Sequence, residues 1–163
     1  MSQQLPKLVR LVPPPAEPAR PDWDEVERDL RLRLPTDYKG LVDRYGDREF
    51  GGFLRLLDPR VLALTAREIL DDEAPLREQE DPAQYPYPFH PEPGGLLGWA
   101  TTHNGDWLCW LTAGEPDAWP VVVWQRRPMW YHRHEAGAVG FLYGWLTGRV
   151  TSLVPPRGPR LTP

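Results

Sequence analysis

The most constraining feature of the sequence is a pair of apolar segments that flank a short turn sequence. The segments cover residues 96–101 and 106–112, and His103-Asn104-Gly105 lies between them. Asn-Gly supplies the positive φ angles that a type I′ hairpin turn requires, so the pattern predicts two antiparallel strands. A parallel pair would need a crossover of about a dozen residues or more, which this connection lacks. The fold must therefore contain an antiparallel or mixed sheet.

Helical patterns precede the hairpin. Asp22 is a good N-terminal cap with Glu25 three residues later, and the helix that follows carries apolar residues at helical spacing: Trp23, Val26 and Leu30. Pro35 suits the start of a second helix. Its apolar stripe is Tyr38, Leu41, Val42 and Tyr45, and Gly46 is a natural end.

The other segments give weaker patterns. Residues 50–57 are apolar with Gly51 and Gly52, which predicts one strand with a bulge or bend. A short helix is expected over about residues 66–73, and residues 75–93, with six prolines, are expected to be irregular. Further strands are predicted over 120–125 and 130–135, and an amphipathic helix over 139–150.

This order of elements predicts an α+β fold, an antiparallel or mixed sheet with helices packed mainly on one side. Five prolines in residues 1–20 predict an extended or disordered arm, because proline lacks an amide donor and fixes φ. The tail, residues 154–163, is also proline-rich. A chain of 163 residues fits one domain, which we place at residues 21–153.

Composition limits the environment and the partners. The net charge of −4 is unlike that of basic nucleic-acid-binding proteins, and no segment has the run of apolar residues that a membrane span needs. Cys109 is the single cysteine, so no internal disulfide forms, and the N-terminus lacks the pattern of a signal peptide. We expect a cytoplasmic protein that binds neither nucleic acid nor membrane.

No catalytic, cofactor or metal site is predicted. His132 and His134 share one face of a strand, but a metal site needs three or four ligands, so solvated strand histidines are the simpler interpretation. Cys109 lies within a predicted apolar strand, which favours a buried core thiol over a nucleophile. Asp106 follows the Asn-Gly turn, where aspartate is often structural. Phosphate loops and the common hydrolase motifs are absent from the sequence.

The charge distribution gives the one candidate binding surface. Residues 68–92 contain eight acids and a single base, Arg77. Such a block is commonly a solvated loop, but a concentrated field also attracts a basic protein partner. Aromatic residues beside it suit an interface, or could instead pin the loop to the domain. The candidate partner-binding residues are Glu68, Asp71, Asp72, Glu73, Glu78, Glu80, Asp81, Tyr85, Tyr87 and Phe89; Glu92 completes the acidic block.

Several segments together resemble the SUKH superfamily, which is named partly for a yeast regulator of cell-wall synthesis. The run Leu34-Pro35-Thr36-Asp37-Tyr38, followed by Leu41-Val42 and Tyr45-Gly46, is similar to its "LPxDY…l…yG" segment. The resemblance spans about residues 22–149. It also includes Trp23, Val26 and Glu27, Phe50-Gly51-Gly52, residues 54–59 and 95–100, Asn104-Gly105-Asp106 with Leu108, Cys109 and Trp110, and residues 141–146.

The resemblance implies an α+β fold without a recognised active site. Bacterial members are mostly immunity proteins that neutralise a cognate toxin, often a nuclease or deaminase, and eukaryotic members act as interaction modules. We therefore expect a toxin domain as the partner, with basic character left open, and a chain that is a monomer or a weak homodimer. Two alternatives stay open: a regulatory module in cell-wall or signalling control, and an unrecognised hydrolase.

Overall fold

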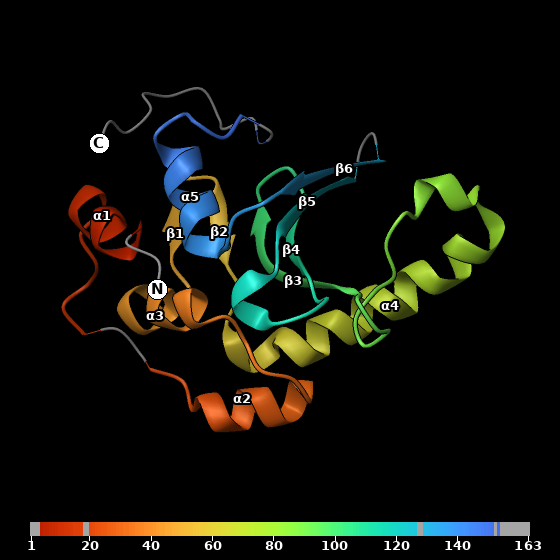
Figure 1. Ribbon diagram of the computed structural model, residues 1–163, viewed down its shortest axis with the longest axis horizontal. Coiled ribbons are helices and arrows are strands. Elements are labelled where there is room, and N and C mark those ends of the chain that lie inside the picture. The colour runs from red at the N-terminus through yellow and green to blue at the C-terminus, as the bar shows by residue number, and fades with distance from the viewer. Residues whose placement is uncertain (1–3, 18–19, 127–128, 152, 154–163) are drawn as a thin grey trace.

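A computed structural model describes residues 4–17, 20–126, 129–151 and 153 (Figure 1). Its six strands form one sheet in chain order, and every neighbouring pair is antiparallel. The strands are β1 (Glu49–Phe50), β2 (Leu54–Leu56), β3 (Leu96–Thr102), β4 (Trp107–Leu111), β5 (Val121–Arg126) and β6 (Met129–His134). The helices in the described residues are α1 (Gln4–Leu11), α2 (Trp23–Leu30), α3 (Thr36–Tyr45), α4 (Leu62–Gln79) and α5 (Ala138–Leu146). The predicted α+β class is confirmed.

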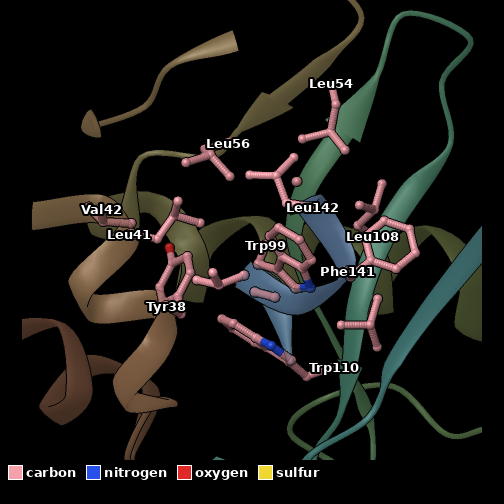
Figure 2. Close-up of a cluster of buried hydrophobic side chains, with 14 of the residues drawn as sticks. Tyr38, Leu41, Val42, Leu54, Leu56, Trp99, Leu108, Trp110, Phe141 and Leu142 are labelled. Carbon is pink, nitrogen blue, oxygen red and sulfur yellow. The ribbon is translucent and has the colours of Figure 1, made fainter. Parts of the chain in front are cut away.

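The main core lies on one face of the sheet. Leu97 and Trp99 of β3 point to this face, as do Leu108 and Trp110 of β4, and the two tryptophan rings stack with centroids 5.7 Å apart (Figure 2). Buried residues of all five helices join this cluster, including Leu8, Val26, Leu41, Leu62 and Leu142. The helices therefore pack mainly on one side of the sheet, as expected.

A smaller apolar cluster covers the opposite face. It contains Phe89 together with Leu96, Cys109, Val122 and Trp124 from the sheet. Ile69 and Leu70 of α4 pack against it, so α4 starts in the main core and continues to this second face. The middle of α4 and the segment around Phe89 thus pack on a surface that the other helices leave open, and the C-terminal end of α4 projects beyond the sheet (Figure 1).

The predicted helices α2 and α3 are confirmed. The Glu25 amide donates to the Asp22 carboxylate at 3.2 Å, as a cap should, and α3 begins directly after Pro35. Helix α5 differs from the prediction in its exposure. Almost every residue of α5 is buried, because α1 packs against the side of α5 that points away from the sheet. The helix is therefore internal rather than amphipathic.

The expectation of an extended N-terminal arm is wrong for residues 4–11, which form α1. Pro6 lies in the first helical turn, where the missing amide costs nothing because it would have no helical acceptor. Leu8 is fully buried, and the Tyr45 hydroxyl donates to the Val12 carbonyl at 2.6 Å. Apolar contacts of the tertiary fold thus outweigh the local effect of the prolines. The proline-rich tail, residues 154–163, lies outside the described residues.

Two turns also differ from the prediction. Residues 50–57 form the β1–β2 hairpin rather than one strand, and Gly51 and Gly52 take φ of 60° and 61° in its turn. In the β3–β4 hairpin only Gly105 has positive φ, at 81°, and its amide donates to the Thr102 carbonyl at 3.0 Å. This is a three-residue loop closed by a glycine, not a type I′ turn at Asn104-Gly105.

Helix α4 is longer than the predicted helix over 66–73. It runs through Pro75 to Gln79, where irregular structure was expected. Contacts with the rest of the protein hold the helix before and after the proline. Ile69 and Leu70 pack on the second cluster before it, and Arg77 pairs with Glu92 after it. Side-chain packing therefore preserves a helix that local sequence would end.

Candidate functional site

Six acids of the predicted surface are exposed on α4 and just beyond its end. They are Glu68, Asp71, Asp72, Glu78, Glu80 and Asp81. The helical repeat places Glu68, Asp71 and Asp72 on the side opposite to Ala66 and Glu73, which face the protein. Leu64 lies on this outer side and is 57% exposed, whereas Leu76, 46% exposed, lies between the outer side and the side of Glu73. We call these eight residues the α4 acidic face.

The acids of the α4 acidic face form no direct ion pair within the described part of the chain, although exposed Arg67 lies one helical turn before Asp71. No ion pair joins Glu68, Asp71, Asp72, Glu78 or Glu80 to any described base. Glu68 and Asp72 are one helical turn apart, a like-charged spacing that destabilises a helix by about 0.2–0.5 kcal/mol. The face therefore presents a field that a cationic partner would relieve.

Glu73 does not belong to this surface. Its side chain is buried, accepts a hydrogen bond from Arg126 at 2.8 Å and another from the Tyr85 hydroxyl at 3.1 Å. The Arg126 guanidinium also lies 5.2 Å from the centre of the Trp124 ring. The interpretation of Glu73 as a docking residue is thus corrected: its carboxylate ties α4 to strand β5.

Glu92 is likewise occupied within the protein. Arg77 donates to both of its carboxylate oxygens, at 2.7 and 3.3 Å, and the Phe89 amide donates at 3.1 Å. These bonds, led by the one from Arg77, lower the pKa of the Glu92 carboxyl. The acidic block of the sequence therefore divides into free acids on α4 and acids that hold its distal segment in place.

The three aromatic candidates pin the segment after α4 to the sheet. Phe89 is fully buried, 5.2 Å from the Trp124 ring, and Tyr87 meets Tyr131 edge to face at 5.7 Å. Tyr85 packs on Phe89 and is partly exposed. Phe89 therefore has no side-chain surface to offer a partner, whereas Tyr85 and Tyr87 are only partly covered. Of the two interpretations given above, the structural one accounts for these contacts.

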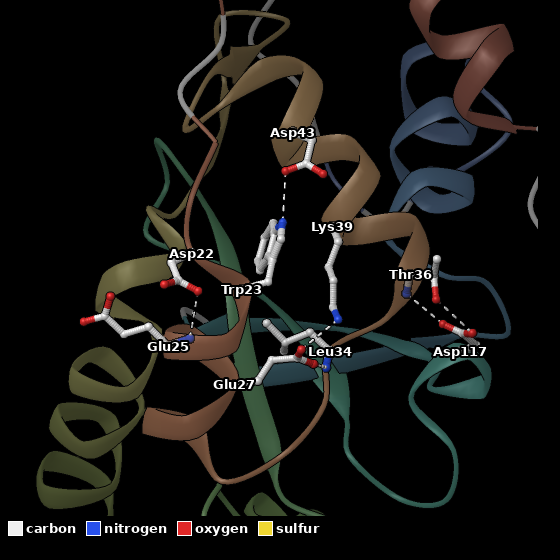
Figure 3. Close-up of polar contacts among 9 residues, drawn as sticks. All are labelled: Asp22, Trp23, Glu25, Glu27, Leu34, Thr36, Lys39, Asp43 and Asp117. Carbon is white, nitrogen blue, oxygen red and sulfur yellow. Dashed lines mark hydrogen bonds and ion pairs between the residues drawn. The ribbon is translucent and has the colours of Figure 1, made fainter.

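The residues of the Leu34–Tyr38 motif form a network that joins helices (Figure 3). The Glu27 carboxylate accepts from the Leu34 amide at 2.7 Å and from Lys39 at 2.8 Å, which fixes α2 against α3. Asp117 caps α3, because the Thr36 amide and hydroxyl donate to it at 2.7 and 3.1 Å. The motif is thus a set of capping and bridging contacts at the start of α3.

Asp37 of the same motif caps a different helix. Its carboxylate accepts from the amide of Val139, near the start of α5, at 3.2 Å, and from the Tyr38 amide at 2.8 Å. Burial raises the pKa of the Asp37 carboxyl, and these amide bonds oppose the shift. Asp37 and Asp117 line an open hollow of about 550 Å³ beside Leu5, Gly40 and Gly140. Both carboxylates of that hollow serve as helix caps.

Comparison with known protein families gives a match over residues 21–141, to a SUKH_6 family model described as SMI1-KNR4 cell-wall. The chain belongs to the SUKH family. Comparisons with curated proteins and with solved structures found no match. SUKH domains are generally protein-interaction or immunity-type domains, which supports a role in binding another protein. The Leu34–Tyr38 motif makes structural contacts here, so the family match does not identify the residues that bind a partner.

The side chains considered for chemistry also have structural surroundings in this SUKH domain. Cys109 is fully buried in β4, and burial raises the pKa of its thiol. The Thr102 hydroxyl donates to Asp106 at 3.2 Å across the hairpin turn. His103 contacts Glu49, and His134 packs on Phe141. Within the described residues no three His, Cys, Asp or Glu side chains are grouped as a metal would require.

Sequence reasoning missed the exposed apolar residues. Leu64 and Leu76 escaped notice because the predicted helix was too short for its outer side to be traced. Trp130, 58% exposed on β6, is the most exposed large apolar side chain in the described residues. Its exposure has no local sequence signal, since it depends on β6 being an edge strand. None of the described helices is both long and apolar enough to cross a membrane.

Proposed function

We propose that this SUKH domain is an immunity protein, which binds a cognate toxin domain through the α4 acidic face and blocks its activity. The partner is a basic protein, of the nuclease or deaminase type, and the encounter takes place in the cytoplasm. The observation that carries the proposal is the row of unpaired acids on the outer side of α4. The SUKH_6 match supports the general role in protein binding.

The chemistry of such toxins explains why an acidic helix would suit them. Proteins that grip nucleic acid carry lysine and arginine at the positions that meet phosphates. Carboxylates at Glu68, Asp71 and Asp72 offer similar charge on a rigid helix, and so would compete for the same groups. Exposed Leu64 and Leu76 add apolar surface beside these acids. Occupation of the toxin's substrate groove is the proposed mechanism of neutralisation.

Anchoring of α4 favours this role. The bonds of Glu73 to Arg126 and of Arg77 to Glu92 hold the helix on the sheet from its inner side. The outer acids are therefore presented without a large loss of conformational freedom on binding, which improves affinity.

A growth assay tests this proposal. A toxin domain encoded beside this gene, or captured with the protein, is expressed alone and together with the full chain. We expect the chain to restore growth, and a Glu68→Gln/Asp71→Asn/Asp72→Asn variant to restore it less well. The matched control carries Asp24→Asn and Asp29→Asn, two exposed acids of α2, and should protect fully. Equal protection by both variants would remove the acidic face from the mechanism.

The regulatory alternative predicts a different result in the same host. A regulatory module would bind several proteins, each in substoichiometric amounts, and none of them would be toxic when expressed alone. A single toxic partner that binds one to one supports immunity.

A further inference from the structure

The free flank of β6 forms one border of the sheet. In the strand order β6 is terminal, and it pairs only with β5 among the described strands (Figure 1). The opposite border, β1, has two residues, whereas β6 has six. A long edge strand presents main-chain groups to which another strand can bond.

The hydrogen-bond pattern identifies the groups that point outward. The Leu111 amide of β4 donates to the Pro120 carbonyl, so the main chain of Pro120 points toward β4. Because successive residues of a strand direct their main-chain groups to opposite sides, the main chain of Val121 points toward β6. Alternation along the β5–β6 ladder then directs Trp130 and His132 toward β5. The amides and carbonyls of Tyr131 and Arg133 therefore point away from the sheet, and no described group outside it bonds to them.

The side chains of β6 lack the usual protection of an edge. The strand contains no proline, no lysine and no carboxylate, and its single arginine, Arg133, donates to Glu135 at 2.6 Å. Trp130 is 58% exposed, and its ring lies 5.9 Å from that of His132 on the same face. An exposed tryptophan on an unprotected edge strand is typical of an interface.

We propose that two copies of this chain pair through β6, antiparallel about a two-fold axis, so that their sheets become continuous. A two-fold axis perpendicular to the sheet keeps equivalent faces on the same side. The axis must pass through a residue whose main chain points outward, and Tyr131 is such a residue, so it opposes Tyr131 of the partner subunit. With Tyr131 on the axis, Trp130 opposes His132 of the partner subunit, and this aromatic contact occurs twice.

Charge favours a second copy as the occupant. In this register Arg133 opposes Met129 of the partner subunit, so the strand's cation meets no like charge. The strand is thus complementary to itself in both main-chain and side-chain terms. The acidic face belongs to α4, which takes no part in this pairing, so the inference does not rest on the proposed function.

Sedimentation velocity of the full chain, over protein concentrations up to the millimolar level, tests the pairing. Arg133→Pro removes an outward amide but no bond to β5, and Arg133→Ala is its matched control because it keeps that amide. Trp130→Ser removes the aromatic contact. We expect wild type and Arg133→Ala to dimerise alike, and the other two variants to dimerise at least about tenfold more weakly, because each change acts twice.

The pattern among the variants decides the outcome. Circular dichroism confirms that each variant is folded, and Trp130→Ser keeps the test valid if Arg133→Pro does not fold. A wild-type chain that stays monomeric at every concentration overturns the proposal and leaves the edge to a strand of another protein. Dimerisation that neither variant weakens, or that Trp130→Ser weakens while a folded Arg133→Pro does not, also overturns strand pairing.

Discussion

The clamp between Glu73 and Arg126 allows a quantitative prediction about the stability of the domain. Glu73 is 2% exposed and accepts one charged and one neutral hydrogen bond, from Arg126 and Tyr85. Glu73→Ala removes the two carboxylate oxygens, so the Tyr85 hydroxyl and the Arg126 guanidinium each lose an acceptor. We expect the variant to unfold more easily than wild type.

The size of the effect follows from the surroundings of each partner. Breaking a fully buried ion pair costs about 3–5 kcal/mol, because an uncompensated charge stays buried. The Arg126 side chain is 43% exposed, so it can turn to water and avoid most of that penalty. The loss of a charge-assisted bond and a neutral bond then gives a decrease of about 2 kcal/mol in the free energy of unfolding. For a domain of this size the melting temperature should fall by about 4–8 °C.

Urea unfolding, followed by tryptophan fluorescence, measures this change. Glu80→Ala is the control, since Glu80 is exposed and has no described ion pair, and it should change the free energy by less than about 0.5 kcal/mol. In a double-mutant cycle with Arg126→Ala, we expect a coupling of about 1–2 kcal/mol. Equal stability of Glu73→Ala and Glu80→Ala, or zero coupling, would refute the clamp.

Three further predictions concern α5 and the core. Burial raises the pKa of Asp37, so its contribution to stability is complete below its unfolded pKa and is lost as pH rises through the folded pKa. The stability difference between wild type and Asp37→Asn, measured by denaturant titration at a series of pH values, should therefore decrease as pH rises through that window; an increase would contradict the assignment. Gly137→Ala should cost about 1–2 kcal/mol, because a Cβ there would lie 2.5 Å from the Asp37 carboxylate. Its control, Gly140→Ala, meets nothing closer than 3.7 Å and should stabilise the helix by about 0.5–1 kcal/mol in the same unfolding assay. Cys109 should react with a thiol reagent only on unfolding, and rapid labelling of the native protein would show that β4 is not buried as described.

Capping residues and apolar stripes in the sequence correctly predicted the bounds and the buried faces of α2 and α3. Asp22 and Gly46 delimit α2 and α3 as predicted, because capping depends on bonds within a few residues of the cap. The stripe from Tyr38 to Tyr45 is buried in full, since one face of a short helix suffices to meet the sheet. Such features are readable because the residues that cause them are neighbours in the chain.

The predictions that failed concern features decided by contacts between residues far apart in the chain. Helix α1 forms because Leu8 finds a buried site against α5, more than a hundred residues away. Pro75 does not end α4, because Glu73 and Arg77 are bonded to β5 and to Glu92. Glu73 could not be distinguished from Asp72 by charge alone; only the helical phase of a correctly bounded α4 places one inside and the other outside. Long-range contacts thus decide which acids are free.

Capture of a partner from the native host tests the central claim, that the α4 acidic face binds a basic protein. Tagged wild-type chain, the Glu68→Gln/Asp71→Asn/Asp72→Asn variant and the Asp24→Asn/Asp29→Asn control are washed in increasing salt, and bound proteins are identified by mass spectrometry. We predict one stoichiometric basic partner on wild type and control, released by salt and largely lost from the α4 variant. A partner that all three chains retain equally, or no stoichiometric partner on any of them, would contradict the claim.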